Sequence, residues 1–379
     1  MLPGTRFRFI DAARAVAMLF VFLSHFVESF FGAERSTTRE IIRQISLVAS
    51  PSFVITSGVL IGFLSRTQRD RFAALKIRLI DRGIFLLTIG HLLLSGSFVL
   101  SVNTSFADIV EHTLFVTDAI GVSLIVTPML VTRFAPMTRL GMSTALFTLS
   151  WLVIITWHPH TVLGSALQET VFGSGSPVFY AYAFPLLPWF SLHVAGTVLG
   201  EQLGERLLRG DQRGMLHLLG QVGAGCAILA FAIKSLYVAA RWYGVRGAFM
   251  YALTSPFQKY PPSPAYLLFY AGVGVGIVLT GCLLVERYDL ISLKWASALG
   301  QTSLGMFIIQ SYVYYFGVHS LAPYLSKSLW PVWLVLSIAV NLALTWMWRR
   351  WNLNRFITVG YRQFMERRAA QVRDEEALA

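Results

Sequence analysis

Long apolar runs recur along the whole sequence, and they limit the fold more than any other feature. The hydrocarbon core of a bilayer is about 30 Å thick, so a helix needs about 20 mainly apolar residues to cross it. Backbone N–H and C=O groups find no water there, and a helix satisfies these groups within one segment. The sequence therefore predicts an all-α integral membrane protein. Its 55% hydrophobic and 13% charged residues agree, because a soluble domain usually carries about 25% charged residues.

Ten apolar runs have the length of a membrane-spanning helix. We expect the spans at residues 9–31, 45–65, 79–102, 117–134, 140–157, 179–201, 215–240, 266–285, 296–319 and 329–348. An even number of spans places both ends of the chain on one side of the membrane. If that side is the cytoplasm, its loops hold about three times as many Lys and Arg residues as the opposite loops, Arg133 and Arg139 among them, as the positive-inside rule requires. We therefore expect a bundle of about ten transmembrane helices in the inner or plasma membrane, with both the N-terminus and the C-terminus cytoplasmic.

The spans and their loops occupy residues 1–352 and leave no room for a separate soluble domain. Residues 353–379 mix aromatic side chains with arginines, which predicts a basic amphipathic tail along the cytoplasmic membrane surface. The formal net charge is +12, but the Lys and Arg residues flank apolar runs, so we expect contact with the lipid bilayer and no nucleic-acid binding. Cys226 and Cys282 lie inside apolar runs and are interpreted as core residues.

Ionisable side chains inside membrane helices are energetically costly, and each is a candidate for a functional role. The predicted spans contain Asp11, Arg14, His25, Asp81, Arg82, His91, Asp118, His193 and Lys234. His91 and His193 are interpreted first as partners in interhelical hydrogen bonds. Lys234 is equally compatible with a buried site and with snorkelling to the membrane surface.

The first span carries the most informative arrangement, because Arg14 and His25 are eleven positions apart. Eleven steps of about 100° return to within about 20° of the starting direction, so both side chains lie on one face of a helix. With a rise of about 1.5 Å per residue, His25 lies about 16 Å deeper than Arg14. Asp11 precedes Arg14 by almost one turn and can orient it. The alternative is that Arg14 snorkels to headgroups and His25 only hydrogen-bonds a neighbouring helix.

This arrangement suits the transfer of an activated acyl group across the membrane. Arg14 can bind a phosphate-bearing donor such as coenzyme A at the cytoplasmic mouth. An imidazole can take a proton from an attacking hydroxyl or amine, or carry the acyl group itself. A second cluster, Arg78, Asp81 and Arg82, begins the third span, where phosphates or anionic lipids would bind. The positive-inside rule alone also explains the basic loop before it.

We expect no metal site. His158 and His160 are two positions apart, but no third ligand lies closer than Glu169. Glu169 is interpreted instead as a contact for an acceptor sugar, because it belongs to a long irregular loop on the far side, and such loops are often functional. A second long loop covers residues 242–265.

Several segments resemble a known family of membrane acyltransferases. The first is IDAARAVAMLFVFLSHF (10–26), in which Arg, ten residues and His follow one another. The others are PSFVITSG (51–58), RLIDRGIFLLTIG (78–90), DAIGVSLIV (118–126), FPLLPWFSLHVAGTVLG (184–200) and LGQTSLGMFIIQ (299–310). In this order they resemble the heparan-α-glucosaminide N-acetyltransferase catalytic family and its bacterial relatives, in the acyltransferase-3-like superfamily.

The resemblance implies a multi-helix bundle that moves an acyl group from cytoplasmic acyl-CoA to a saccharide or glycoconjugate at the opposite face of the membrane. The acyl group that the resemblance implies is acetyl. It also implies His25 as the catalytic residue and Arg14 as its companion. Two positions depart from the family pattern. Ala15 follows Arg14 where Gly is usual, and Gln310 stands where relatives commonly have His. Gln310 cannot titrate, so either it only orients the acceptor or the chemistry of this branch differs.

The sequence thus predicts an acyltransferase with three groups of site residues. The predicted catalytic residues are His25, Arg14 and Asp11, and the predicted donor contacts are Arg78, Arg82 and Asp81. The predicted acceptor contacts are Trp189, His193, Gln310 and Glu169. A homo-oligomer is left open. The alternatives are a small-molecule transporter or exporter, since buried charges are also typical of transport pathways, and a non-catalytic subunit in envelope assembly.

Overall fold

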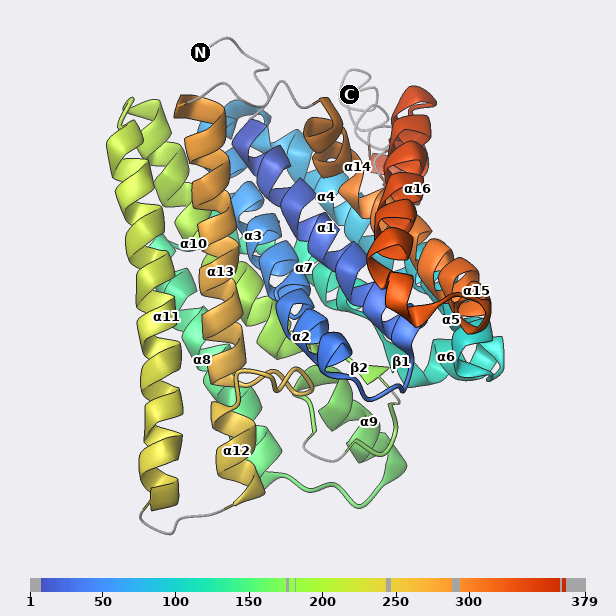
Figure 1. Ribbon diagram of the computed structural model, residues 1–379. Helices are drawn as coiled ribbons and strands as arrows, with labels where there is room; N and C mark the ends of the chain where they lie inside the picture. Colours follow the sequence, from blue (N-terminus) through green and yellow to red (C-terminus); the bar gives the residue numbers. More distant parts are fainter. Residues whose placement is uncertain are drawn as a thin grey trace, which may run out of the picture.

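Long helices running side by side form a bundle in the computed structural model of the protein (Figure 1). The structure describes residues 8–174, 177–180, 182–242, 247–287, 294–361 and 363–365. The first described helix starts, and the last long helix ends, at the same end of the bundle, which is the top of Figure 1. We call it the upper end, and the opposite one the lower end. This arrangement agrees with an even number of crossings.

The long helices follow the predicted spans. They are α1 (Arg8–Phe31), α3 (Ala49–Thr67), α4 (Phe72–Phe85) with the π-helical turn η2 (Leu86–Gly90) and α5 (His91–Val102), α7 (Val116–Arg133), α8 (Pro136–Thr156), α10 (Leu186–Leu208), α11 (Gln212–Trp242), α13 (Pro264–Cys282) with the π-helical turn η3 (Leu283–Arg287), α14 (Lys294–Ser311) with the π-helical turn η4 (Tyr312–Val318), and α16 (Trp330–Arg350). Within the described residues, eight helices are long and apolar enough to cross a membrane. The protein is therefore an all-α, multi-pass membrane protein.

Two predicted spans, 179–201 and 296–319, are helical but are not among those eight. They correspond to α10 and to α14 with η4. The helix α10 begins only after Pro185, and its last two turns carry the charged residues Glu201, Glu205 and Arg206. It is therefore less apolar than the predicted segment. The number of ten crossings stays a prediction.

Short elements gather toward the lower end (Figure 1). They are α2 (Thr37–Ser46), α6 (Phe106–His112), α9 (Val162–Val171), α12 (Ala248–Thr254) and α15 (His319–Leu321), with the 3-10 turns η5 (Ala322–Tyr324) and η6 (Lys327–Leu329). Two-residue strands β1 (Thr113–Leu114) and β2 (Tyr182–Ala183) pair in parallel, Thr113 with Tyr182. The two long predicted loops thus contain α9 and α12. Two further 3-10 turns are η1 (Arg69–Arg71) and η7 (Leu353–Phe356).

Glycines allow α3 and α10 to lie in backbone contact. A Cβ atom at Gly58 or Gly62 of α3 would collide with carbonyl groups of α10, and one at Gly200 would collide with the backbone of Val59. Small residues permit such close approach, and van der Waals packing between helices is a main source of association energy within a membrane. The α3–α10 pair therefore forms a closely packed wall of the bundle.

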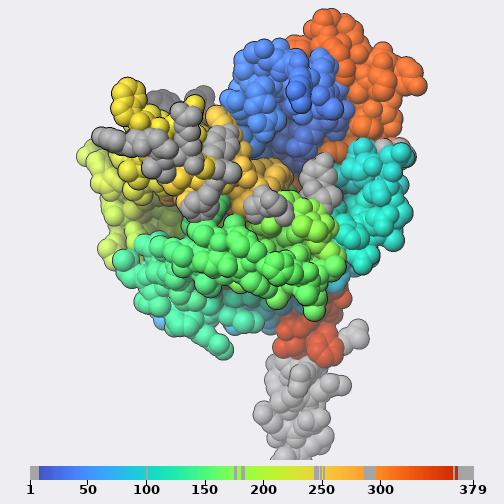
Figure 2. All heavy atoms as spheres, turned by 90° about the horizontal axis from the view of Figure 1, so that it is seen from below, coloured from blue at the N-terminus to red at the C-terminus, as the bar shows by residue number. Residues whose placement is uncertain are grey.

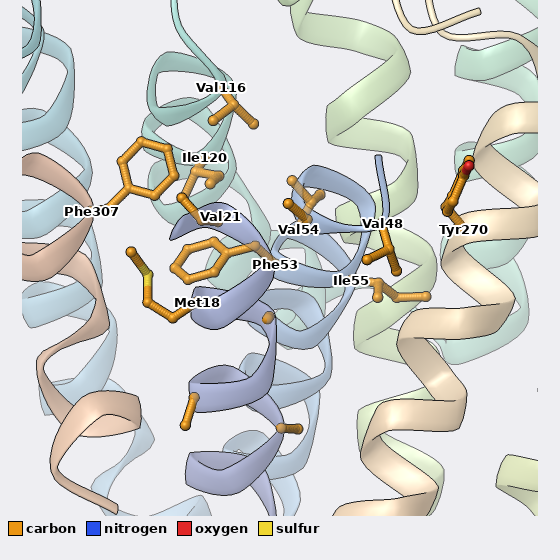
Figure 3. Close-up of a cluster of buried hydrophobic side chains, with 14 of the residues drawn as sticks. Met18, Val21, Val48, Phe53, Val54, Ile55, Val116, Ile120, Tyr270 and Phe307 are labelled. Atoms are coloured by element: carbon orange, nitrogen blue, oxygen red, sulfur yellow. The ribbon is translucent and has the colours of Figure 1, made fainter. Parts of the chain in front are cut away.

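An apolar cluster fixes α1 against its neighbours (Figure 3). Met18 and Val21 of α1 are buried together with Phe53 of α3, Ile120 of α7 and Phe307 of α14. The rings of Phe53 and Phe307 are 5.9 Å apart. Because Val21 precedes His25 by about one turn, this cluster determines where the lower half of α1 lies.

Candidate active site

A cavity of about 550 Å³ lies toward the lower end of the bundle and is lined by His25. Its walls come from distant parts of the sequence: the lower half of α1, the start of α3, α5, β1 with the residues after it, the segment before α13, and η4. Figure 2 views the lower face, where α2 in blue, α6 in cyan and the α9 region in green are grouped around the centre. The cavity thus brings together parts of the chain that the sequence separates by almost 300 positions.

One face of α1 is turned to this cavity. Val21, His25, Glu28 and Gly32 all line it, at the spacing expected for one side of a helix. The helix ends at this point because Gly32 has a φ of +54°, a left-handed conformation that glycine adopts readily and that commonly follows a helix C-terminus. Glu28 therefore lies between the catalytic candidate His25 and the end of the helix.

Gln310 of α14 orients the imidazole of His25. Nδ1 of His25 lies 2.8 Å from Oε1 of Gln310. Nε2 of Gln310 donates to the Phe307 carbonyl at 2.9 Å and to Ser311 Oγ at 3.2 Å. Because the amide N–H groups are used in this way, the Gln310 oxygen faces His25, and Nδ1 of His25 carries the proton. The basic lone pair of the neutral ring is then on Nε2, for which the described residues provide no hydrogen-bond partner.

Aromatic rings hold His25 from the other sides. The imidazole centroid lies 6.1 Å from that of Phe307, 6.4 Å from that of Tyr314 and 5.0 Å from that of Tyr315. The Tyr315 hydroxyl donates to Glu28 Oε2 at 2.5 Å. These contacts restrict the ring of His25 to one orientation and fix the carboxylate one turn below it.

The predicted companions of His25 lie nearer the upper end of α1. Arg14 is half-buried and Asp11 is buried, and neither lines the cavity. A Cβ atom at Gly300 of α14 would collide with the backbone of Asp11, so α1 and α14 touch there. Since α1 is one uninterrupted helix, Arg14 and His25 share a face as predicted. The structure does not bring Arg14 into the cavity of His25.

The predicted donor cluster divides into two parts. Arg78 and Arg82 are exposed on α4, where they are accessible to an anion. Asp81 is buried, and its carboxylate accepts hydrogen bonds from the backbone N–H groups of Val359 at 3.1 Å and Tyr361 at 3.0 Å, and from a neighbouring hydroxyl of the tail. Because α4 begins at Phe72, the cluster lies in the second half of this helix and not at its start, and the Asp81 carboxylate fastens the start of the predicted tail there.

None of the four predicted acceptor contacts lines the cavity. Trp189 is fully buried and packs behind Phe184, a cavity residue, at 5.4 Å between ring centroids. His193 is also fully buried, with Nδ1 3.2 Å from Thr127 Oγ1 and Nε2 3.4 Å from a serine hydroxyl of α3. The carboxylate of Glu169 accepts backbone N–H groups of residues 178–180 at 2.7 to 3.1 Å. The first three side chains thus pack against or hydrogen-bond other parts of the protein. The fourth, Gln310, contacts His25.

Of the described residues that line the cavity, His25 alone was predicted as a site residue. Those not predicted include four with charged or phenolic side chains, Glu28, Tyr315, Arg39 and Lys259. Glu28 could have been identified from the sequence, because it follows His25 by three positions and so lies on nearly the same helix face. Arg39 and Lys259 were assigned to far-side loops, and nothing in the local sequence indicates that these loops border a cavity.

A second group of charges lies between α3, α8 and α10, and two of its members, Arg139 and Glu201, are buried. Arg139 donates to Thr197 Oγ1 at 2.7 Å and pairs with Glu201. Arg66 pairs with Glu201 at 3.4 Å and with Glu205. The assignment of Arg139 to a loop was wrong, because α8 begins about one turn earlier than predicted and encloses this fully buried side chain.

Among the residues that the structure describes, no group of three or more His, Cys, Asp or Glu side chains could hold a metal ion. Cys226 is half-buried, Cys282 is buried, and neither belongs to a disulfide. Both therefore fill space between helices, as their apolar surroundings predicted.

The family model for heparan-alpha-glucosaminide N-acetyltransferase, catalytic, matches residues 6–224, which is more than half of the chain. The protein belongs to this family. No curated protein matches the chain. Membership in the heparan-alpha-glucosaminide N-acetyltransferase family identifies a membrane acetyltransferase, and the family uses acetyl-CoA as donor. The match begins before α1 and ends within α11, so it includes His25 and Arg14 but not Gln310, Tyr315 or Lys259.

Proposed function

We propose that the protein transfers an acetyl group from cytoplasmic acetyl-CoA to a saccharide or glycoconjugate at the opposite face of the inner or plasma membrane. Family membership supports the reaction type. The observation that carries the catalytic assignment is His25, whose Nδ1–H is engaged by Gln310 and whose Nε2 has no partner among the described residues that form the cavity. A ring nitrogen in this state is a base and a nucleophile.

Two routes use the same atom. In the direct route, Nε2 removes the proton of the acceptor hydroxyl or amine while the acceptor attacks the thioester carbonyl, and the C–S bond breaks. In the covalent route, Nε2 attacks the carbonyl first and the C–S bond breaks. The acceptor then attacks the acetyl carbon, and the bond between this carbon and Nε2 breaks. In both routes the acceptor's proton ends on the thiolate of coenzyme A. The Gln310 oxygen stabilises the positive ring through Nδ1–H in each case.

The donor contacts are proposed at the upper end. Arg14, Arg78 and Arg82 carry guanidinium groups, which bind phosphate oxygens with a favourable planar geometry. With both termini and this end in the cytoplasm, coenzyme A would reach the protein from the side where it is made. The thioester would then extend along α1 toward His25, while the acceptor enters the cavity from the lower end.

The direct test uses purified protein in lipid nanodiscs, acetyl-CoA labelled in the acetyl group, and a panel of sugar acceptors. We expect labelled product from the parental protein and a loss of about 10²–10⁴-fold in His25→Ala, the contribution typical of a positioned acid–base group. His217→Ala is the matched control, because His217 is exposed on α11, far from the cavity residues in sequence. Transfer by His25→Ala at the parental rate would refute the catalytic assignment.

A further inference from the structure

Two cationic side chains face the cavity that contains His25. Arg39 comes from the first turn of α2 and Lys259 from the segment before α13, and both line the cavity. Among the described residues that line the cavity, Glu28 is the only one with a carboxylate. Its Oε2 already accepts the Tyr315 hydroxyl at 2.5 Å. With neutral histidines, the lining side chains therefore carry an excess of one positive charge.

The guanidinium of Arg39 has no anionic partner within the described part of the chain. Its Nε is buried and makes no hydrogen bond. The nearest acid on the same helix, Glu40, is bound by Arg43 through two hydrogen bonds of 2.9 and 2.8 Å and by Gln44 at 3.0 Å. The acid that could neutralise Arg39 is thus already used by a neighbour.

Lys259 is held in a similar state. Its ammonium lies over the rings of Phe184, at 5.0 Å, and Tyr260, at 5.1 Å, and no ion pair or hydrogen bond involves it among the residues described. Burial lowers the pKa of Lys259, the nearby Glu28 carboxylate opposes this shift, and Arg43 adds to it. Its segment is ordered by a hydrogen bond from Ser263 N–H to the Gln258 carbonyl at 3.0 Å. The ammonium is therefore positioned before any ligand binds.

Partly buried cations without partners are energetically unfavourable, and an anion that pairs with them recovers this energy. Arginine and lysine only donate hydrogen bonds, so the ligand must supply acceptor oxygens. We propose that Arg39 and Lys259 bind an anionic group of the acceptor, a carboxylate or a phosphate, and so hold the acceptor in the cavity of His25. This assignment rests on the proposed function, and it names the acceptor class as acidic or phosphorylated saccharides.

The test compares sugars that differ only in an anionic group. Methyl glucoside is compared with methyl glucuronide, and glucose with glucose 6-phosphate, for binding to the protein in nanodiscs of zwitterionic lipid, measured by titration calorimetry. We expect at least one anionic sugar to bind about tenfold more tightly than its neutral counterpart, the range of a charge-assisted hydrogen bond. The glucuronide pair reports a carboxylate site and the phosphate pair a phosphate site.

Arg39→Gln and Lys259→Gln should each reduce this preference several-fold, and the double variant should abolish it. Arg35→Gln is the matched control, because Arg35 is exposed just before α2 and does not line the cavity. The melting temperature separates binding from structure: removing an unpaired cation should not lower it, whereas loss of a structural contact would.

Equal binding of neutral and anionic sugars by the parental protein would overturn the inference, as would an anion preference that survives in the double variant. Failure of the proposed function would give a different result. The protein would then cleave no acetyl-CoA with any acceptor, whereas the calorimetric titration would still show whether Arg39 and Lys259 bind an anionic sugar.

Discussion

Two regions of this bundle bury charged or titratable groups, and they differ in how those groups are satisfied. Between α3, α8 and α10, Arg66 and Arg139 face Glu201 and Glu205, and each guanidinium has at least one carboxylate partner. Around the lower half of α1, His25 has one free nitrogen, and the cations beside it have no carboxylate of their own among the described residues. In the first region both guanidinium groups are paired with carboxylates, although Nε of Arg139 makes no hydrogen bond. In the second region the cations have no such carboxylate within the described part of the chain, so they can still bind an anionic ligand.

The difference teaches that a charge inside a membrane helix does not by itself mark an active site. A charge that is paired inside the protein stabilises the fold or fixes the register of its helices, and removing one partner leaves the other uncompensated. An unpaired group beside a cavity can react or bind. His193 and His25 make the same contrast, because both nitrogens of His193 have hydroxyl partners.

The largest effect is expected from breaking the ion pairs between α3, α8 and α10. Arg139→Leu leaves Glu201 buried with only Arg66 nearby, and removing one partner of a buried ion pair costs about 3–5 kcal/mol. We expect a much lower melting temperature in detergent and unchanged acetyl transfer per folded molecule. The double variant Arg139→Leu, Glu201→Leu should recover part of the stability. A stable Arg139→Leu protein that has lost transfer would place this network in the catalytic site instead.

The second prediction concerns the partner of His25. Gln310→Leu removes the acceptor of Nδ1–H, so the ring can rotate or change tautomer, and we expect transfer to fall by about 10²-fold, as small misplacements of a catalytic group can cause. Gln310→Glu keeps an acceptor oxygen and should retain most of the activity. Both transfer rates are measured with labelled acetyl-CoA. Equal rates for Gln310→Leu and Gln310→Glu would contradict the orienting role of Gln310.

A smaller effect should appear in the pH dependence of acceptor binding. Burial lowers the pKa of Lys259 below its usual 10.5, so its positive charge is present at low pH and is lost as the pH rises through the lowered value. The KM of an anionic acceptor should therefore increase on the alkaline side, and that of a neutral acceptor should not. Lys259→Arg stays charged, and the increase should disappear. An increase that persists in Lys259→Arg would point to another group.

The smallest effect is expected at Asp81, whose carboxylate already accepts three hydrogen bonds. Asp81→Asn weakens three hydrogen bonds to residues 358–361, each contributing about 1 kcal/mol or somewhat more when charged. We expect faster amide hydrogen exchange at residues 353–361 and little change in the core helices, measured by mass spectrometry. Unchanged exchange in the tail would mean that packing of Ile357, which is buried, holds it instead.

The sequence predicted the helices well and the site only in part. Period and length identified every long helix, because a membrane-crossing segment must be both apolar and helical. The spacing of Arg14 and His25 gave their common face. The partners of His25 could not be deduced in this way, since the contact with Gln310 joins positions 285 apart in the chain. Arg139 was misplaced because Pro136, a good first helical residue, was not used to set the helix start.

Roles were harder to predict than positions. Trp189 and His193 were expected to contact the acceptor, yet their side chains are buried against other helices. Glu169 was expected to face a sugar, but it accepts three backbone N–H groups of its own loop. A sequence gives the chemical type of a group, whereas the packing of the whole chain decides whether the group still has a free lone pair or proton.

The contact between α1 and α14 also bears on how the enzyme is made. His25 is among the first residues to enter the membrane, whereas Gln310 and Tyr315 are among the last. A nascent chain that stops before α14 lacks the groups that set the orientation of the imidazole. Transferase activity should therefore be silent throughout membrane insertion and begin only when the final helices have joined the bundle, so that activity itself reports complete assembly.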